Sequence, residues 1–382
     1  MKKALAIILT MVFLLLSGCG KLQPGGRNSS GSNEDANDSR EKITEEGNDR
    51  AKEETRESGS ESDFSSNPSP APSETIDIYE IKPNEAGRVM IVMFHRFVES
   101  FTPSASDDGQ FVITFKDFEN LLETLYNKGY RLISLRDFLD NNIKVAPGFI
   151  PIIFTFDDGS SGQFNLIEEN GELKVNPNSA VGIMEKFYKE HPDFGLAGTF
   201  YVNLGTNTFL GKGTLAERLN YLIDMGFEIG NHTLTHIDLY EAGEEKIIAE
   251  VGGNQKKMSE LVAGYSLDTL ALPFGNNART ELQNFVYGGE YEDVEYHNRT
   301  VLRVGWNPTY SPVNKDFNPL SLNRVRAPGF FPVDFDLNWW LDNLSREEQY
   351  ISDGNPDKIT VPAALEDSLD KSRLDGKELI LY

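Results

Sequence analysis

The sequence predicts an α/β domain: a parallel sheet that closes, or nearly closes, into a barrel covered by helices. Apolar runs of strand length alternate with segments of helical period along about 300 residues, and the strand runs are apolar at successive positions. Polar residues follow these runs directly, as expected where parallel barrel strands end at one common face. Regular alternation over this many units favours a barrel over an open sheet.

Each predicted element has its own local signals. The run RVMIVMF at 88–94 indicates a buried strand, and the helix predicted at 114–129 starts at a threonine suited to an N-cap and ends at a glycine. The other predicted strands are 130–135, 149–156, 196–203, 227–232, 269–275 and 300–306, and the other predicted helices are 136–142, 180–191, 214–226 and 245–264.

Residues 1–18 predict a lipoprotein signal peptide. Lys2 and Lys3 precede an apolar run that is too short to favour a membrane span. The tetrapeptide LSGC resembles the bacterial lipobox, in which the cysteine, here Cys19, is lipid-modified and becomes the first residue of the mature protein. The alternative is an ordinary secretory signal. A lipid at Cys19 implies a protein anchored in the cell membrane and facing away from the cytoplasm.

Composition divides the remaining chain into a tether and a domain. Residues 19–75 are rich in Ser, Asn, Gly and charged residues and predict a disordered tether, whereas 76–382 predict the barrel domain. Cys19 is the only cysteine, so no disulfide can form within the chain. The formal net charge of −24 argues against nucleic acid or an anionic membrane as a partner of the domain, which we expect to be a monomer.

Two predicted strand ends carry residues suited to metal chemistry. Asp157 and Asp158 follow one apolar run, and His232 and His236 follow another. One carboxylate and two imidazoles form a mixed ligand set for a divalent transition metal, with coordination positions left open. The second carboxylate is then free to act as a base. In isolation, either pair would more simply be a loop motif or a pair of solvated side chains.

Three motifs, TFDDG, HTLTH and LPFG, resemble in order and approximate spacing those of the polysaccharide deacetylases, the NodB-like group also called carbohydrate esterase family 4. The resemblance extends from about residue 89 to 326. It implies a distorted (β/α)7 barrel that removes N-acetyl groups from an acetylated amino-sugar polysaccharide, whether poly-N-acetylglucosamine, peptidoglycan or a chitin-like polymer. It also implies one divalent metal ion, for which we expect Zn²⁺, with Co²⁺, Ni²⁺ or Mn²⁺ as alternatives.

The resemblance assigns roles to individual residues. Asp157 corresponds to the general base, Asp158, His232 and His236 to the metal ligands, and Pro273 and Phe274 to a wall of the substrate groove. Trp306 follows a predicted strand, where its ring could stack on a sugar or pack in the core.

The sequence departs from the family pattern at two points. The family often has an arginine before the proline of the third motif, but here Leu272 precedes Pro273, and Arg324 or Arg326 could instead orient the base. The family usually ends in a strand with a catalytic histidine, whereas this chain ends KELILY. His95, after the first predicted strand, resembles the YH motif of a circularly permuted branch that includes poly-N-acetylglucosamine deacetylases. This resemblance implies that His95 is the general acid.

Two alternatives to an N-deacetylase stay open at this point. The departures would suit a catalytically silent carbohydrate-binding lipoprotein, and the same site could support an O-acetyl esterase of the xylan type. An insertion after TFDDG adds a predicted hairpin turning at Asn170 and Gly171, which we expect to shape one wall of the groove.

Overall fold

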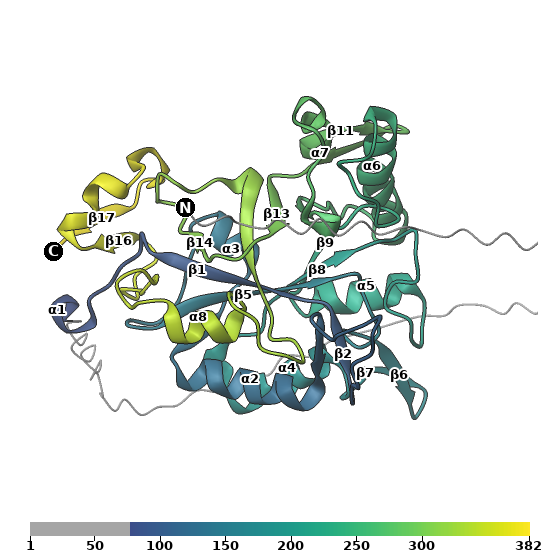
Figure 1. Cartoon of the computed structure of the whole chain (residues 1–382), viewed down its shortest axis with the longest axis horizontal. Helices are drawn as coiled ribbons and strands as arrows, with labels where there is room; N and C mark the ends of the chain where they lie inside the picture. The colour runs from purple at the N-terminus through teal and green to yellow at the C-terminus, as the bar shows by residue number, and fades with distance from the viewer. Residues whose placement is uncertain (1–76) are drawn as a thin grey trace, which may run out of the picture. The chain divides into compact units, whose positions relative to one another are not determined.

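The computed structural model describes residues 77–382 (Figure 1). The predicted signal peptide, the tether and Cys19 lie outside the described residues. In the part that the structure describes, no helix is both long and apolar enough to cross a membrane.

Seven parallel strands form a closed barrel. Around the ring the order is β1, β15, β13, β10, β9, β8 and β5, and β5 pairs back with β1. Their bounds are β1 (Arg88–Phe94), β5 (Ile150–Asp157), β8 (Thr199–Val202), β9 (Glu228–Asn231), β10 (Thr269–Ala271), β13 (Thr300–Val304) and β15 (Leu322–Arg326). The predicted fold class, a (β/α)7 barrel, is confirmed. The first barrel strand in the chain, β1, closes against the last, β15.

One barrel strand is not the one that the sequence predicts. The segment predicted at 130–135 forms β4 (Tyr130–Leu132), which pairs only with the start of β5 and stays outside the ring. The seventh place belongs instead to β15, with the sequence LNRVR. Its inward-facing positions carry two arginines, Arg324 and Arg326, so an apolar pattern does not reveal this strand.

Short strands and hairpins decorate the barrel. They are β2 (Arg96–Val98) with β3 (Val112–Thr114), β6 (Leu166–Glu169) with β7 (Glu172–Val175), β11 (Gly288–Tyr291) with β12 (Val294–His297), β16 (Lys358–Val361) with β17 (Glu378–Leu381), and β14 (Thr309–Tyr310) against β1. The β6–β7 hairpin turns at Asn170 and Gly171, with φ of 55° and 80°. These positive φ values are those that an Asn-Gly hairpin turn requires, and the predicted hairpin is present.

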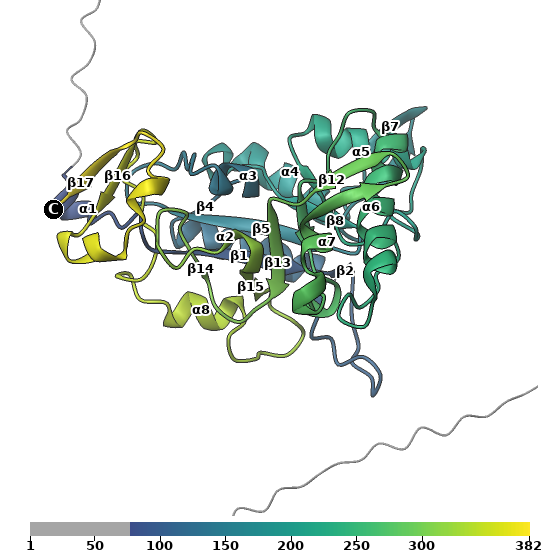
Figure 2. The ribbon, with the colours of Figure 1, turned by 90° about the horizontal axis from the view of Figure 1, so that it is seen from above.

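Helices cover the outside of the barrel (Figures 1 and 2). The longer ones are α2 (Phe115–Asn127), α4 (Ala180–Glu190), α5 (Leu215–Asp224) and α6 (Glu244–Leu261), and the shorter ones are α1 (Ile78–Ile81), α3 (Leu135–Leu139), α7 (Asn284–Tyr287) and α8 (Leu337–Asn343). Short 3-10 segments are η1 (Pro192–Phe194), η2 (Pro273–Gly275), η3 (Thr280–Leu282), η4 (Pro319–Ser321), η5 (Ala363–Ser368) and η6 (Lys371–Arg373). Thr114 caps α2 as predicted, and Thr214 forms a capping box with Glu217 at the start of α5.

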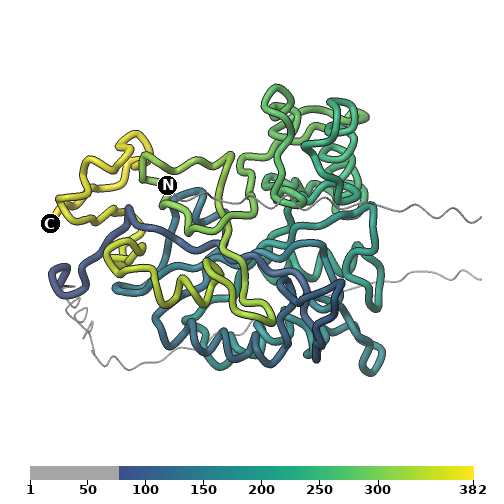
Figure 3. Tube along the Cα trace, viewed as in Figure 1, coloured from purple at the N-terminus to yellow at the C-terminus, as the bar shows by residue number. Residues whose placement is uncertain are grey.

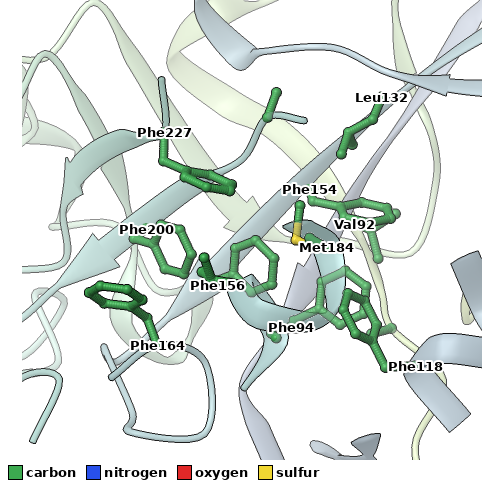
Figure 4. Packing of buried hydrophobic residues seen from close by; sticks show 14 of the residues in the cluster. Val92, Phe94, Phe118, Leu132, Phe154, Phe156, Phe164, Met184, Phe200 and Phe227 are labelled. Atoms are coloured by element: carbon green, nitrogen blue, oxygen red, sulfur yellow. The ribbon is translucent and has the colours of Figure 1, made fainter. Parts of the chain in front are cut away.

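The outward-facing positions of the strands build the main core (Figure 4). Phe156 of β5 stacks on Phe200 of β8 with ring centroids 4.6 Å apart, and Phe94 of β1 meets Phe118 of α2 edge to face at 5.4 Å. Burying each such ring contributes roughly 1.5–3 kcal/mol to stability. This layer packs one face of each strand against the surrounding helices. Because side chains alternate along a strand, those at the other positions face into the barrel.

The inward-facing positions converge on the mouth of the barrel. Along β5, Ile153 lies deep in the barrel, Thr155 follows it, and Asp157 ends the strand. Along β15, Leu322 lies deep and Arg324 comes next on the same face. Because side chains alternate with a period of two, these positions share one interior. Inside the barrel, a lower layer of apolar side chains is therefore followed by a layer of polar side chains at the carboxyl ends of the strands.

The two ends of the described chain meet at the opposite pole of the barrel (Figure 3). Tyr79 packs edge to face on Tyr382, with ring centroids 5.8 Å apart. Nearby, the buried carboxylate of Glu85 accepts hydrogen bonds from the backbone N–H groups of Thr360 (2.8 Å) and Asp353 (3.2 Å). Burial, followed by the charge of Asp353, raises the pKa of Glu85 to about 8.

The raised pKa of Glu85 makes stability depend on pH. Its pKa is about 8 in the folded state against 4.5 as the ordinary value, so the folded protein holds the extra proton between these two pH values. The stabilisation that protonated Glu85 contributes to the folded state is complete below about pH 4.5 and is lost as the pH rises through about 8. We therefore expect the difference between the melting temperatures of Glu85→Gln and wild type to become more positive from pH 5 to pH 8. Thermal denaturation at several pH values measures this difference. A constant difference would contradict this effect.

Candidate active site

Asp157 is a buried carboxylate held by an arginine of β15, two strands away in the ring. Its Oδ1 and Oδ2 accept hydrogen bonds from Nη1 and Nη2 of Arg324 at 2.6 and 2.7 Å. Burial by itself raises the pKa of Asp157, but Arg324, His232 and His95 outweigh it, and the pKa falls below its usual range. Asp157 is therefore ionised at neutral pH, and the two-pronged contact fixes the plane of its carboxylate.

Arg324 is itself seated by several groups inside the barrel. Its side chain is fully buried; Nη1 also donates to Thr155 Oγ1 at 3.3 Å, and the Tyr201 ring lies 5.8 Å from the guanidinium carbon. Of the two arginines considered from the sequence, only Arg324 contacts Asp157. Arg326 donates to Gln110 Oε1 at 2.8 Å.

Asp158, His232 and His236 bring their ligand atoms together beside Asp157. One ligand atom from each lies within 4.8 Å of the others. Asp158 Oδ1 is 3.4 Å from His232 Nε2 and 3.3 Å from His236 Nε2. A carboxylate oxygen and two imidazole nitrogens at these separations suit a divalent transition metal.

The tautomer of His232 supports the same interpretation. Its Nδ1 lies 2.7 Å from the carbonyl oxygen of Ala271, which can only accept a hydrogen bond. Nδ1 therefore carries a proton, which leaves Nε2, on the side of Asp158, as the nitrogen that a metal would use. Metal-bound histidines are commonly held by such a second hydrogen bond, so the residues present fit a metal ion.

The backbone around these ligands is strained. Asp158, Thr233 and His236 have φ of 75°, 63° and 61°, although none is a glycine. Such conformations cost on the order of 1–3 kcal/mol each and persist where the surrounding structure imposes them. The positive φ of Asp158 departs from the strand conformation just after Asp157, and the two neighbouring carboxylates have different contacts.

His95 follows β1, which borders β5 in the ring, whereas β9, which leads to His232, lies beyond β8 in the other direction around the ring. Its Nε2 is 3.7 Å from Asp157 Oδ2, and its ring packs on Phe111 with centroids 4.8 Å apart. Its Nδ1 is buried and has no hydrogen-bond partner in residues 77–382. Burial lowers the pKa of His95, and Asp157 acts in the opposite direction.

The predicted groove residues have different environments. Phe274 is 64% exposed, and its ring lies 4.8 Å from that of His236. Trp306 is 62% exposed at the end of β13, so it is not a core residue. Pro273 is buried at the start of η2, and Phe274 follows it with a φ of 59°. The assignment of Pro273 to the groove wall stays a prediction.

Two further side chains hold the site, and sequence reasoning missed both. Asn203 Nδ2 donates to the carbonyl oxygens of His232 and Thr233, and Gln163 Nε2 donates to those of His95 and Asp157. Asn203 directly follows β8, so the signal that singled out Asp157, a polar residue after an apolar strand, could have found it. Gln163 lies in the loop after β5, and no pattern distinguishes it.

These observations first define a class of protein. A parallel barrel that carries a three-residue donor set beside a separate, ionised carboxylate at its carboxyl mouth is built for hydrolysis, since a Lewis acid and a base can then act on one bond. A purely structural metal site would need no such carboxylate.

The family comparison gives the particular kind of hydrolase. Residues 144–286 match the family described as polysaccharide deacetylase, and the chain thus contains a polysaccharide deacetylase domain. The match includes Asp157, Asp158, His232 and His236, whereas His95 and Arg324 lie outside it.

Several solved structures are similar to this chain. A polysaccharide deacetylase from Bacillus cereus is 19% identical, with 68% of this chain and 69% of that chain covered and a TM-score of 0.48. The deacetylase PplD of Streptococcus pyogenes, solved with acetate, is 16% identical (68% and 98% covered, TM-score 0.49). IcaB from Ammonifex degensii is 16% identical (63% and 92% covered, TM-score 0.44). No curated protein matches the chain significantly.

Proposed function

We propose that this protein hydrolyses N-acetyl groups on an amino-sugar polysaccharide at the outer side of the cell membrane, as a metal-dependent enzyme. The observation that carries the proposal is Asp157, an ionised carboxylate clamped by Arg324 and set apart from the Asp158, His232 and His236 donor group. A silent binding protein needs no second, ionised carboxylate 3.9 Å from His232 of the donor group, whereas hydrolysis needs a base there.

Asp157 and His95 divide the proton transfers between them. Asp157 takes a proton from the attacking water through Oδ2, the oxygen nearest to both His95 (3.7 Å) and His232 (3.9 Å). Arg324 keeps this carboxylate ionised and oriented. His95, in its charged form with both ring nitrogens protonated, delivers the Nε2 proton to the departing amine and is left as a neutral imidazole. The proton that Asp157 took from water then returns to His95, whose Nε2 lies 3.7 Å from Asp157 Oδ2, and both groups are restored. The products are acetate and a free amino group on the sugar.

The donor group completes the site when a metal is bound. A divalent ion, in first place Zn²⁺, would be held by Asp158, His232 and His236 and would supply Lewis acidity toward the acetyl oxygen. Asn203 and Ala271 hold the backbone and ring of His232 for this purpose.

The direct test is acetate release by the purified, metal-loaded protein. N-acetylglucosamine tetramers and an O-acetylated xylan should be supplied in parallel. We expect release from the tetramers at least about tenfold faster than from the xylan. The reverse preference would favour the O-acetyl esterase, and no release from either substrate with metal bound would favour the silent binding protein.

The membrane location rests on Cys19 and has a separate test. We expect the full chain to fractionate with membranes when expressed in a bacterial host, and Cys19→Ser to be found in the soluble fraction because it cannot be acylated. Metabolic labelling with a fatty-acid analogue should mark only the wild type. Membrane retention and labelling of Cys19→Ser would exclude anchoring through this residue.

A further inference from the structure

A short turn, residues 232–236, carries both histidines of the donor group. Its backbone is strained at Thr233 and His236, with φ of 63° and 61°. Such conformations persist only where neighbouring groups impose them. Within the turn, the N–H of His236 donates to Thr233 Oγ1 at 3.1 Å, and residues outside the turn supply most of its other hydrogen bonds. The support of the turn must therefore come from the elements around it.

Glu250 of α6 binds the residue that directly precedes His236. Its Oε2 accepts a hydrogen bond from the N–H of Thr235 at 2.8 Å, and its Oε1 accepts one from the Thr235 hydroxyl at 2.7 Å. The N–H of Leu234 donates to the backbone carbonyl oxygen of Glu250 at 2.9 Å. The Glu250 side chain is only 2% exposed, and Lys246, one helical turn earlier, donates to Oε1 at 2.7 Å. Hydrogen bonds to an ionised carboxylate are roughly twice as strong as neutral ones, so Glu250 holds the turn firmly.

A second polar residue of α6 binds the strand ends next to the turn. Asn254 Oδ1 accepts from the N–H of Leu204 at 2.9 Å, and Asn254 Nδ2 donates to the carbonyl oxygen of Val202 at 2.8 Å and to Asn231 Oδ1 at 3.0 Å. Residues four positions apart on a helix lie on the same face. Glu250 and Asn254 therefore form one polar face of α6 that holds the turn together with the ends of β8 and β9.

The two histidines of the donor group differ in how far they depend on this support. His232 has a hydrogen bond of its own, between its Nδ1 and the carbonyl oxygen of Ala271. The His236 ring packs edge to face on Phe274, with centroids 4.8 Å apart, but the Phe274 side chain is itself 64% exposed. The position of His236 thus depends on the backbone of the turn, which Glu250 holds.

We propose that Glu250 is a positioning residue that holds His236, through Thr235, in the place where the donor group binds a metal ion. The inference deepens the proposed function and rests on it, because the donor group must bind a divalent ion. Glu250 touches neither the ion nor the substrate. Its substitution should change the affinity and geometry of metal binding, while Asp157 and His95 keep their contacts.

The Zn²⁺ affinity of the full chain, measured by competition with a chelator, tests this role without relying on turnover. We expect Glu250→Ala to weaken Zn²⁺ binding about 30-fold, within the roughly 10- to 100-fold that loss of an outer partner of a metal ligand costs. Glu250→Gln should retain most of the affinity, because an amide can still bind Thr235 through its oxygen and its nitrogen. The matched control is Glu185→Ala, at a buried glutamate of α4 that accepts a hydrogen bond from Tyr221 at 3.2 Å, and it should not change the affinity.

The absorption spectrum of bound Co²⁺ reports the geometry of the donor group. At saturating Co²⁺, the visible bands of Glu250→Ala should differ from those of wild type, because transition metals respond to the arrangement of their ligands. The bands of Glu185→Ala should match wild type. A loss of packing alone would lower the melting temperature but leave the spectrum of the folded, loaded protein unchanged.

A double-mutant cycle shows whether Glu250 acts through His236. In the His236→Ala background, Glu250→Ala should have little further effect on the Zn²⁺ affinity, because the ligand that Glu250 positions is already missing. An equal effect of Glu250→Ala in both backgrounds would show that Glu250 stabilises the fold and does not position this ligand.

Thr235→Val provides a second variant should Glu250→Ala fail to fold. Thr235 is exposed, and valine keeps its size but removes the hydroxyl that binds Glu250. We expect weaker Zn²⁺ binding in Thr235→Val and no change in the control Thr124→Val, at an exposed threonine of α2. Unchanged Zn²⁺ affinity in Thr235→Val and in every folded Glu250 variant would overturn the inference and leave the deacetylase intact. A wild-type protein that binds neither Zn²⁺ nor Co²⁺ would instead reject the proposed metal-dependent function, and the inference with it.

Discussion

Asp157→Asn is expected to lower the rate of acetate release by about a thousandfold, within the 10²- to 10⁴-fold range that general base catalysis contributes. An amide cannot take the proton from water, and it keeps nearly the volume of the carboxylate. The donor group formed by Asp158, His232 and His236 is untouched, so the metal content should stay at the wild-type level. The measurement is acetate release from a tetramer under saturating metal, with metal analysis of the same sample.

The same substitution leaves Arg324 buried with a neutral partner, and stability must therefore be measured beside activity. Loss of one member of a buried pair costs about 3–5 kcal/mol. Thermal unfolding will show whether the variant is folded at the assay temperature. Asp224→Asn is a suitable control, because Asp224 is exposed at the end of α5, at the pole opposite the mouth. A folded, metal-loaded Asp157→Asn protein with near wild-type activity would exclude Asp157 as the base.

Arg324 illustrates what the sequence could not decide by itself. The family often orients its base through an arginine before the proline of the third motif, and here that position is Leu272. In the structure, an arginine from β15 reaches Asp157 because β15 lies beside β1, and β1 beside β5. Alternation along the strand explains why Arg324 faces the interior, but only strand order shows that it meets Asp157.

The strand ends could be predicted because their signal is local. A fully apolar run followed by Asp157, or by His95, identifies a buried strand and its polar end without knowledge of its neighbours. β15 has no such run, since its inward positions include Arg324, and β4 has an apolar pattern although it stays outside the ring. A charged residue such as Arg324 can be buried only if it has a partner, and here the partner is far away in the sequence. The periodicity of a segment gives no information about such a partner.

Prediction of the donor group also needed information from residues that are distant in the sequence. His232 and His236 are close in sequence, yet two imidazoles at this spacing could equally be a solvated pair. The arrangement gains chemical meaning from Asp158, brought beside them across β8, and from the Ala271 carbonyl of β10, which sets the tautomer of His232. The departures from the family pattern that suited a silent binding protein are thus offset by a complete set of side chains at the mouth.

Removal of one donor is the second large effect that we expect. His236→Ala should weaken metal binding by more than the roughly 10- to 100-fold that loss of an outer hydrogen-bond partner costs, because a direct ligand is lost. Asp158→Ala should have a similar effect, and acetate release should fall in parallel with metal content in both variants. Metal analysis after dialysis against a defined free Zn²⁺ concentration gives the affinity.

Matched controls separate metal loss from unfolding. His236 is half-buried and Asp158 is 42% exposed, so neither truncation opens a large cavity in the core. His297→Ala, on the exposed surface of β12, should keep both metal and activity. If high Zn²⁺ restores the metal content of His236→Ala, partial recovery of acetate release should follow, since Asp157 and His95 are intact. Full activity in a metal-free His236→Ala protein would show that Asp157 and His95 act without a metal, and the proposed mechanism would then be wrong.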